Sequence, residues 1–571
     1  MSETRIDLGV FDGHNAAACL SIDGRVVAAL QEERLTRLKN DVGTPVRAIE
    51  WLATEYELDL SQITQVAVAS RYVARMERPE DLLKGFDRRY EGTPHYRLAT
   101  WLGRQDRYRN WRTGSRIQQR TETLTRLGLP RDRIQYYDHH ETHAATAYHG
   151  LRQDDGDYLV ITLDGGGDGL SGSVWKGAGG QLHPLAQVSQ RDSLGELYAV
   201  VTHLLGFKPL EHEFKIMGMA PYATDEYAEP VAAILRRYLR VERQGLRWIC
   251  GVREPIAQVG RRLEKDLRRV RFDSICAGLQ KFTEEAMTQW VSAWIQETGL
   301  RRVLVAGGVF MNVKASKVIC ELPEVDFFAA FPSCGDESLP FGACYLATAG
   351  RGVMPDALTH AYLGPEVGLE ESRAVVADAG ERVHVEEPGD MADRVAELLA
   401  DGQIVARASG KMEFGARALG SRSILADPIN QDVVRVINRM IKKRDFWMPF
   451  APVVRRQEAA AYFRNPKDLP SPYMMNTFDS TDRRTEFMAA VHNADLTARP
   501  QLLEDGQNPG YEAILDRFAQ RTGRHVLLNT SFNLHGEPVV SGAADAVRVL
   551  LNSGLRYLAL GDLLVTKRGA P

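Results

Sequence analysis

The chain has 571 residues, enough for several folding units at roughly 150 residues each, and a chain of this length needs no disulfides to stabilise a core. Its 71 Lys and Arg residues against 75 Asp and Glu residues give a net charge of −4, which argues against nucleic acid as the main partner. Hydrophobic residues at 44% and charged residues at 26% match average globular proteins, so a disordered or fibrous chain is excluded.

The cysteines and the first residues indicate where the protein resides. The six cysteines are scattered without any Cys-x-x-Cys pair, which is typical of a reducing compartment and excludes zinc-finger modules. Residues 1–5 do not form a basic stretch followed by an apolar core, and no apolar stretch reaches the length of a membrane span. We therefore expect a soluble, cytoplasmic protein without a membrane partner.

Two segments of the chain share one order of predicted elements: a strand, a polar loop with Asp-Gly, and a hairpin. The ranges of the first copy are 6–11, 12–15, 18–22 and 25–30. The ranges of the second copy are 158–163, 164–169, 171–175 and 182–188. Such a repeat predicts a duplicated α/β unit, as in actin-like and sugar-kinase ATPases, whose glycine-bearing turns face phosphate. Two unrelated hairpins are the alternative.

An arginine-rich stretch lies between the two copies, with Trp101 and Trp111 interleaved. Its arginines are Arg104, Arg107, Arg109, Arg112, Arg116 and Arg120. Nucleic-acid binding, acceptor recognition or a dimer contact are conceivable there. The acidic balance of the chain favours a solvated helical insert whose arginines lie over an aromatic seam.

Two histidines and two aspartates are suited to hold a metal ion. Asp138 can cap the start of a helix that carries His139 and His143, and their spacing of four places both imidazoles on one helix face. Such a pair could also serve a surface or capping role. Asp164 and Asp336 are predicted in loops at strand ends, and two histidines with two aspartates suit iron, manganese or zinc better than magnesium.

A glycine pair follows the predicted strand 303–306. At Gly307 and Gly308 the backbone could approach a nucleotide closely, and Asn312 could bond ribose or phosphate. A tight strand-to-helix turn is the alternative. Further along, an Ala- and Gly-rich helix over 342–349 ends at the breaker run 350–355. This run predicts a domain boundary, with one domain over 1–355 and a second α/β domain over 356–571.

The second domain gathers cations, hydroxyls and amides in apolar, Gly-containing segments. These residues are Arg417, Ser423, Lys442, Arg444, Arg499, Asn529, Ser531 and Asn533. Clustered cations repel one another unless an anion compensates, and arginine and lysine both neutralise phosphoryl oxygens. The pattern favours a phosphate site over a solvated charged face.

The order of several motifs identifies a family. They are 12–14, 32–34 with Arg37 and Lys39, 139–145, 215–222, Gly307-Gly308 with Asn312, 417–420, 449–452, and 529–533 with 536–538. The chain resembles, over essentially its whole length, the NodU/CmcH family of O-carbamoyltransferases. The resemblance implies an actin-like domain related to the enzyme that transfers threonylcarbamoyl onto tRNA, followed by a YrdC-like domain.

The resemblance also implies the chemistry. The YrdC-like domain would make carbamoyl-adenylate from ATP, with Mg²⁺, and carbamoyl phosphate, held by the eight residues of the cation-rich set. The first domain would pass the carbamoyl group to a hydroxyl of a small-molecule acceptor, either a natural product or a sugar. A homodimer is also compatible with the family.

Residue roles carry over from the resemblance as follows. His139, His143, Asp164 and Asp336 look like ligands of a divalent metal, Fe²⁺ in first place and Mn²⁺ or Zn²⁺ as alternatives. Asp12, His14 and Lys39 fall where the acceptor hydroxyl is activated. The residues expected near the adenylate in the first domain are Gly166, Lys215, Gly307, Gly308 and Asn312.

The sequence differs from the family at a position expected to contact phosphate, and three other functions compete with carbamoyl transfer. Met448 stands where the family usually has an arginine, and Lys443 or Arg444 are the candidates to replace it. An RNA-modifying threonylcarbamoyl-type protein is the main alternative, disfavoured by the mild net acidity. A hydrogenase-maturation carbamoyltransferase would carry Cys-x-x-Cys modules, which are absent from the sequence. A kinase-like ATPase would leave the cation-rich set unexplained.

Overall fold

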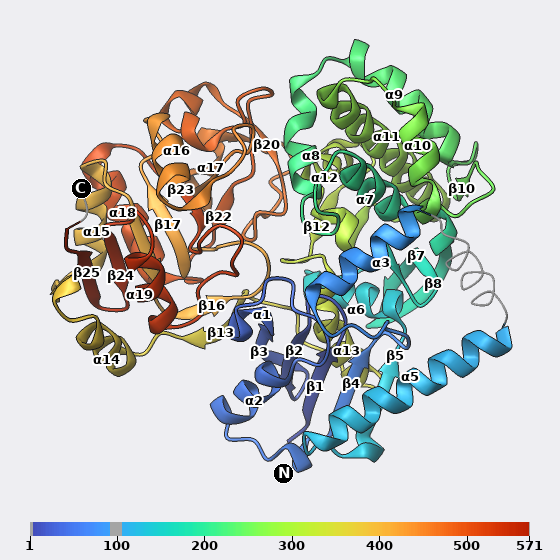
Figure 1. Ribbon diagram of the computed structural model, residues 1–571, viewed down its shortest axis with the longest axis horizontal. Coiled ribbons are helices and arrows are strands. Elements are labelled where there is room, and N and C mark those ends of the chain that lie inside the picture. Colours follow the sequence, from blue (N-terminus) through green and yellow to red (C-terminus); the bar gives the residue numbers. More distant parts are fainter. Residues whose placement is uncertain (1–3, 92–105, 570–571) are drawn as a thin grey trace. The chain divides into compact units, whose positions relative to one another are not determined.

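The computed structural model describes residues 4–91 and 106–569, and the side chains of the second range from residue 110 onward (Figure 1). The chain folds into two units. Unit 1 comprises Met1–Thr36 and Asn40–Leu358, and unit 2 comprises Arg37–Lys39 and Thr359–Pro571. Among the described helices, none combines the length and the apolar character that a membrane crossing requires.

Unit 1 contains two five-stranded sheets with the same topology. The first, ordered β3-β2-β1-β4-β5, consists of β1 (Ile6–Phe11), β2 (Ala17–Ile22), β3 (Arg25–Gln31), β4 (Gln65–Ala69) and β5 (Ile134–Tyr137). The second, ordered β12-β11-β6-β7-β8, consists of β6 (Tyr158–Gly167), β7 (Leu170–Ala178), β8 (Gln181–Ser189), β11 (Arg302–Ala306) and β12 (Phe327–Ala330). In each sheet the first strand opens an antiparallel hairpin, and two later strands add in parallel. The predicted duplication is therefore confirmed.

Two helices approach unusually closely in unit 1. They are α6 (His139–Leu151) and α13 (Leu339–Ala349). A Cβ atom at Gly342 would lie 2.0 Å from the carbonyl oxygen of Thr142, and one at Gly9 in β1 would lie 2.1 Å from the carbonyl oxygen of Pro340. The absence of a side chain at both glycines lets α13 pack against α6 and β1. This packing brings the start of α6 close to the turn that precedes α13.

Further helices surround these sheets. They are α1 (Glu33–Thr36), α2 (Val46–Glu55), α3 (Pro79–Glu91), α5 (Asp106–Arg126), α7 (Leu194–Leu204), α8 (Glu213–Met219), α9 (Asp225–Tyr238), α10 (Gly260–Asp266), α11 (Phe272–Thr298) and α12 (Val313–Glu321). A small ribbon pairs β9 (Leu239–Val241) with β10 (Trp248–Cys250). The arginine-rich stretch forms α5, so its helical character is confirmed. Arg104 and Trp101 lie outside the described residues, as do the side chains of Arg107 and Arg109.

Unit 2 is built on an eight-stranded sheet ordered β14-β25-β24-β15-β17-β23-β18-β22. Its strands are β14 (Val383–Glu386), β15 (Val405–Ala408), β17 (Arg422–Ala426), β18 (Ala451–Arg455), β22 (Gln501–Leu503), β23 (Val526–Ser531), β24 (Tyr557–Leu560) and β25 (Leu563–Lys567). The pairs β15/β24 and β18/β22 are parallel, and the others are antiparallel. Smaller sheets pair β13 (Tyr362–Glu366) with β16 (Lys411–Glu413), and β19 (Phe463–Arg464) with β20 (Phe478–Ser480) and β21 (Thr497–Ala498).

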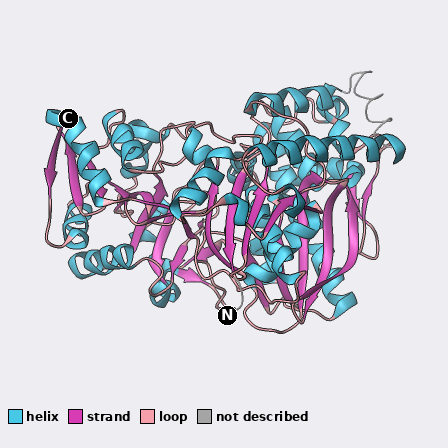
Figure 2. Cartoon of the chain, turned by 90° about the horizontal axis from the view of Figure 1, so that it is seen from below, coloured by secondary structure: helices cyan, strands magenta, loops and turns pink. Residues whose placement is uncertain are grey.

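Helices cover both faces of the large sheet (Figure 2). Successive residues of a strand point to opposite faces, and Ala406 and Val405 accordingly belong to two different hydrophobic clusters. The Ala406 cluster contains residues of α14 (Leu369–Ala379), α16 (Asp432–Ile437) and α19 (Ala543–Leu551). The Val405 cluster contains residues of α15 (Met391–Ala400) and α18 (Pro509–Thr522). A short helix, α17 (Ala459–Tyr462), lies beyond β18. Unit 2 thus combines strands and helices in an α/β arrangement.

Candidate active site and metal centre

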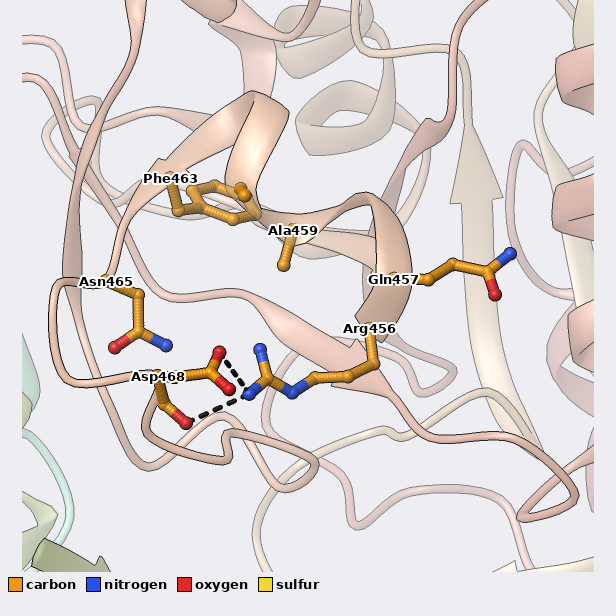
Figure 3. Close-up of a pocket in the computed structure, with 7 residues that line it drawn as sticks. Arg456, Gln457, Ala459, Phe463, Asn465 and Asp468 are labelled. Carbon is orange, nitrogen blue, oxygen red and sulfur yellow. Dashed lines mark hydrogen bonds and ion pairs between the residues drawn. The ribbon is translucent and has the colours of Figure 1, made fainter.

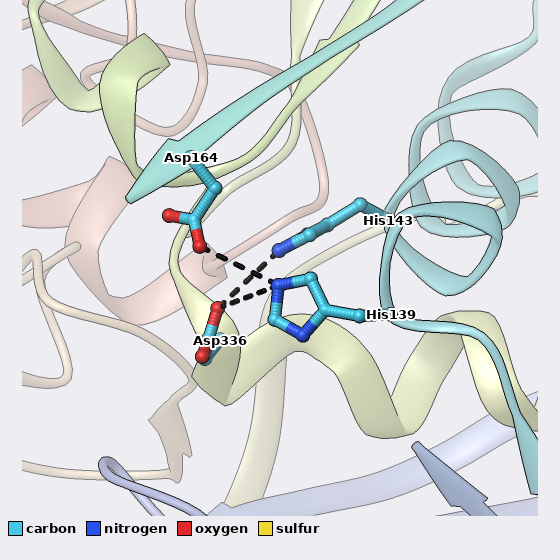
Figure 4. Close-up of side chains that lie close together, drawn as sticks. All are labelled: His139, His143, Asp164 and Asp336. Atoms are coloured by element: carbon cyan, nitrogen blue, oxygen red, sulfur yellow. Dashed lines mark hydrogen bonds and ion pairs between the residues drawn. The ribbon is translucent and has the colours of Figure 1, made fainter. Parts of the chain in front are cut away.

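Four side chains from distant parts of unit 1 meet at one point (Figure 4). His139 and His143 lie one turn apart on α6, Asp164 lies in β6, and Asp336 begins the turn Asp336–Ser338 that leads into α13. Each residue offers one ligand atom, and these four atoms all lie within 4.8 Å of one another. The structure thus brings together the four residues that the sequence suggested for a metal. We call them the metal cluster.

The donor atoms of the metal cluster fit a metal ion. His139 Nε2 lies 3.4 Å from Asp164 Oδ2 and 3.5 Å from Asp336 Oδ1. His143 Nε2 lies 3.3 Å from Asp336 Oδ1. Although it is buried, His139 Nε2 has no hydrogen-bond partner among the described residues, so it is available to a cation. Imidazole nitrogens with carboxylates form a ligand set that suits iron, manganese and zinc.

The electrostatics of the cluster also suit a cation. Burial disfavours a charged His139, but Asp336 and Asp164 outweigh it and raise the pKa of His139 to about 9. Burial likewise opposes ionisation of Asp164, yet the nearby histidines hold the pKa of this carboxyl well below its usual range. Without a metal, a proton on His139 therefore balances the carboxylates. A bound cation would take over that balancing charge.

The start of α6 sets the direction of the two histidines. Asp138 caps the helix as predicted, because its carboxylate accepts hydrogen bonds from the amides of His140 at 3.0 Å and Glu141 at 3.2 Å. His140 turns elsewhere, and its Nδ1 lies 2.8 Å from Thr162 Oγ1. Burial holds the pKa of His140 well below its usual value, so this histidine is a neutral packing residue.

Three glycines lie near Asp164. Two of them donate amide hydrogen bonds to its carboxylate, and the third packs closely against the backbone. The amide of Gly308 donates to Asp164 Oδ1 at 3.0 Å, and the amide of Gly166 donates to Asp164 Oδ2 at 3.4 Å. Gly307 has φ +99°, and a Cβ atom there would lie 2.2 Å from the carbonyl oxygen of Leu163. The structure therefore places all three predicted glycines around Asp164.

The loop after β1 carries Asp12 and His14. His14 Nδ1 lies 3.6 Å from Asp336 Oδ2, and 32% of its side chain is exposed, so His14 borders the metal cluster and is open to an incoming molecule. It also lines a narrow hollow with Asn15, Asn40, Pro79, Leu82, Leu83, Lys208, Pro209 and Leu210. Asp12 is buried and accepts three hydrogen bonds from Arg120.

Arg120 corrects the interpretation of the arginine-rich stretch as a solvated insert. Its side chain is buried in full contact with Asp12, and its guanidinium carbon lies 4.8 Å from the ring centre of Tyr136. Arg116 is half-buried and donates to the carbonyl oxygen of Val73 at 2.8 Å. The expectation was wrong for these two residues, because an ion partner and carbonyl oxygens inside the fold satisfy their charges.

Other residues expected around the adenylate or the acceptor lie in different settings. Asn312 caps α12 through the amide of Ala315 and exchanges two amide hydrogen bonds with Gln280, at 2.9 and 3.0 Å. Lys215 lies on α8 with its Nζ 5.4 Å from the ring centre of Phe207. Lys39 belongs to the short segment that groups with unit 2.

Sequence reasoning missed the polar residues that support the metal cluster. Arg120 comes from a stretch read as surface, Ser70 follows β4 without any motif, and Asp168 was noted only as part of a glycine-rich loop. Asp168 accepts hydrogen bonds from the amides of Arg71 at 2.8 Å and Tyr72 at 2.7 Å. A search for polar residues at strand ends would have found Ser70, since it directly follows β4.

In unit 2, buried and half-buried cations gather where phosphate binding was predicted. Lys442 ends the π-helical turn Asn438–Lys442, and its Nζ donates to Ser531 Oγ at 3.0 Å and to Asn533 Oδ1 at 2.7 Å. Arg444 donates to Thr530 Oγ1 at 3.1 Å. Within the part of the chain that the structure describes, no carboxylate pairs with either of these two cations.

The pKa values of these cations reflect missing negative charge. Burial and the neighbouring Arg444 and Lys39 hold the pKa of Lys442 well below its usual value. Burial and Arg417 lower the pKa of Arg444 to about 10. Burial, Arg417 and Arg444 also hold the pKa of Arg499 well below its usual value. Cations that lower one another's pKa in this way favour the binding of an anion between them. We call Arg417, Lys442, Arg444 and Arg499 the cation cluster.

Two predicted residues lie behind the cation cluster and support its loop. Ser423 is fully buried, and its Oγ accepts a hydrogen bond from the amide of Gly420 at 3.0 Å. Asn529 donates to the carbonyl oxygen of Ala418 at 3.0 Å. Both therefore fix the loop that follows Arg417. Of the two candidates to replace the arginine absent at Met448, Lys443 is exposed, whereas Arg444 is part of the cluster.

A separate pocket of about 410 Å³ in unit 2 contains none of the predicted residues (Figure 3). It is lined by Arg456, Gln457, Ala459, Ala460, Phe463, Asn465 and Asp468. Arg456 donates to Asp468 Oδ1 at 2.5 Å and lies 3.5 Å from Glu504 Oε1. The charge of Arg456 is balanced by these two carboxylates, which distinguishes this pocket from the cation cluster.

Comparisons with known proteins cover both units. A family model described as carbamoyltransferase N-terminus matches residues 6–345, and one described as carbamoyltransferase C-terminus matches residues 396–567. The chain is similar to the nodulation protein NolNO of Sinorhizobium fredii, with 30% identity over 100% of this chain and 81% of that protein. It is similar to the 3'-hydroxymethylcephem-O-carbamoyltransferase of Amycolatopsis lactamdurans, with 35% identity over 30% of this chain and 32% of that protein.

A solved structure of full-length HypF in the phosphate- and nucleotide-bound form matches with a TM-score of 0.32 and 13% identity, over 61% of this chain and 55% of that one. The two carbamoyltransferase models together span most of both units, and the NolNO protein is similar over the full length. The chain therefore belongs to the carbamoyltransferase family that includes the NodU and CmcH types.

Proposed function

We propose that the protein is an ATP-dependent O-carbamoyltransferase whose two units carry out successive half-reactions. The observation that carries this proposal is the cation cluster of unit 2, where buried Lys442 and half-buried Arg444 have no carboxylate partner in the described residues. A site for the phosphates of ATP and of carbamoyl phosphate accounts for it.

In the first half-reaction, unit 2 acts as a YrdC-like domain. Water cleaves carbamoyl phosphate into carbamate and phosphate, and a carbamate oxygen attacks the α-phosphorus of ATP·Mg²⁺. Pyrophosphate leaves, and carbamoyl-adenylate remains. Arg417, Lys442, Arg444 and Arg499 neutralise the phosphoryl oxygens, and the hydroxyl of Ser531 beside Lys442 adds a hydrogen-bonding group. Asn533 orients the lysine.

In the second half-reaction, unit 1 transfers the carbamoyl group to an alcohol. The acceptor oxygen attacks the carbamoyl carbon, AMP leaves, and His14 accepts the hydroxyl proton, since His14 is open to solvent and borders the metal cluster. His139, His143, Asp164 and Asp336 would hold a divalent metal, Fe²⁺, Mn²⁺ or Zn²⁺, which would supply Lewis-acid stabilisation of negative charge. Asp12 holds the His14 loop in place through Arg120. Lys39 is assigned no step in this half-reaction, because it groups with unit 2 and neighbours Lys442.

The acceptor is proposed to be a small molecule with a free hydroxyl. One relative acts, by its name, on a 3'-hydroxymethylcephem, which supports a hydroxymethyl or sugar hydroxyl as the acceptor class.

The test is an incubation of the purified protein with ATP, Mg²⁺ and carbamoyl phosphate in the absence of acceptor. We expect pyrophosphate release and accumulation of carbamoyl-adenylate. Arg444→Met should abolish both, whereas Arg456→Met, which removes a cation with carboxylate partners, should leave both unchanged. His143→Ala should retain adenylate formation and lose transfer. A folded wild-type protein that releases no pyrophosphate would refute the proposal.

A further inference from the structure

The loop that follows β4 contacts the metal cluster through Ser70. Ser70 Oγ lies 2.8 Å from Nδ1 of His139, the ring nitrogen that points away from the carboxylates (Figure 4). Ser70 is 1% exposed, so water does not compete for this hydrogen bond. The hydroxyl therefore contacts Nδ1 of His139, while the other ring nitrogen, Nε2, lies near Asp164 and Asp336.

Backbone contacts hold Ser70 in a conformation that it would not adopt by preference. Its φ is +64°, in the left-handed region that non-glycine residues rarely occupy. Its carbonyl oxygen accepts a hydrogen bond from Arg120 Nη1 at 2.7 Å, and the amides of the next two residues donate to Asp168. Asp168 also accepts from the amide of His139 at 3.0 Å. Strain that is held in place by so many bonds points to a demand on the position of this residue.

The imidazole of His139 is also confined by Gly167. A Cβ atom at Gly167 would lie 2.2 Å from His139 Cγ, so the ring packs directly on the backbone of β6. Confinement by Gly167 limits how the ring can rotate.

We propose that Ser70 is a positioning residue, whose hydroxyl accepts a hydrogen bond from Nδ1 of His139, so that Nε2, which is directed at Asp164 and Asp336, is the nitrogen that offers its lone pair to a metal. The inference rests on the metal centre of the proposed function. A neutral imidazole carries one proton, and a metal needs the lone pair of the other nitrogen, so the hydrogen bond at Nδ1 decides which nitrogen is available. Arg120 and Asp168 hold Ser70 where it can do this.

The neighbouring histidine supplies a matched control. Thr162 Oγ1 lies 2.8 Å from His140 Nδ1, the same distance as in the Ser70 pair, and both pairs are buried. His140 is not part of the metal cluster. Loss of the Thr162 hydroxyl should therefore reveal what removal of a buried hydroxyl–histidine bond does to α6 without affecting metal ligation.

The experiment compares full-length variants stripped of metal and titrated with Co²⁺, followed by its visible absorption. Ser70→Gly removes the hydroxyl and suits the positive φ, whereas Ser70→Ala removes the same hydroxyl and keeps Cβ. Both should bind Co²⁺ about 10- to 100-fold more weakly than the wild type. Thr162→Val should bind like the wild type. Metal-free Ser70→Gly should keep the wild-type melting temperature, because the glycine relieves backbone strain.

Each remaining outcome has a distinct meaning. Equal Co²⁺ affinity in the wild type and both Ser70 variants would overturn the positioning role and leave the metal centre intact. Equal weakening in Thr162→Val would also overturn it, since the effect would then come from general damage to α6. A wild type that binds no Co²⁺ would refute the metal centre itself and, with it, the proposed function of unit 1.

Discussion

The guanidinium of Arg120 donates hydrogen bonds to both carboxylate oxygens of Asp12, which lies 108 positions earlier in the chain. The N–O distances range from 2.5 to 3.0 Å. Both side chains are buried. Burial alone would disfavour the charge on Arg120, but Asp12 outweighs it and raises the pKa of the arginine. Because both oxygens of Asp12 already accept hydrogen bonds from Arg120, His14 is the better candidate for the general base.

Removing one partner of this pair should be costly. Arg120→Met leaves the Asp12 carboxylate buried without its cation, and such a change typically lowers the free energy of unfolding by about 3–5 kcal/mol. Urea denaturation measures the loss. Asp12→Asn combined with Arg120→Met should lose less than Arg120→Met alone, because no uncompensated charge remains. Arg271→Met, which breaks an exposed pair with Asp273, should change stability by roughly 1 kcal/mol or less, and an equally small effect at Arg120 would contradict the expectation.

Gly167 offers a test of how tightly the metal cluster is built. In Gly167→Ala the new methyl group would meet the ring of His139 at 2.2 Å, so the histidine must move. We expect loss of Co²⁺ binding and of carbamoyl transfer, while pyrophosphate release by unit 2 continues. Gly165→Ala is the control, because a Cβ atom there has no neighbour within 4 Å. Similar losses in both variants would mean that β6 as a whole, not the contact with His139, is sensitive.

The metal cluster was foreseeable from sequence, whereas its supports were not. The spacing of His139 and His143 places both on one face of α6 by helix geometry alone. The expectation that Asp164 lies in a loop was wrong, because β6 continues through Asp164 to Gly167. Ser70 and Arg120 act through contacts between segments far apart in the chain. Such contacts leave no periodicity or local signal in the sequence. An arginine that becomes buried therefore cannot be told from a surface arginine by its neighbours in the sequence.

The same limit applies to unit 2. Clustered cations in apolar segments predicted the positions of Lys442 and Arg444, because unpaired charge is seldom buried without a purpose. The roles of Ser423 and Asn529 were not separable from sequence. Both are polar residues beside glycines, and only the fold shows that they support the loop after Arg417.

Glu213 on α8 should make stability depend on pH. Burial raises the pKa of Glu213 to about 7, although the amide of Leu210 donates to its carboxylate at 2.6 Å. Between the unfolded pKa of about 4.3 and a folded pKa near 7, the folded state binds more protons, so stability falls as pH rises through this window. Urea titrations at pH 5 and pH 8 should show a smaller fall in Glu213→Gln than in the wild type. An exposed control, Glu226→Gln, should keep the wild-type slope.

Arg499 should favour the binding of ATP·Mg²⁺ without stabilising the ligand-free protein. Burial and repulsion from Arg417 and Arg444 disfavour its charge, so Arg499→Met should leave the ligand-free protein equally stable or more stable. The rise in melting temperature on adding ATP·Mg²⁺, which follows from preferential binding to the folded state, should shrink in this variant. Arg455→Met removes a cation with three carboxylate partners and should behave oppositely, with lower stability and an undiminished ATP effect. If both variants lost stability alike and kept the ATP effect, the cation cluster would be structural and not a phosphate site.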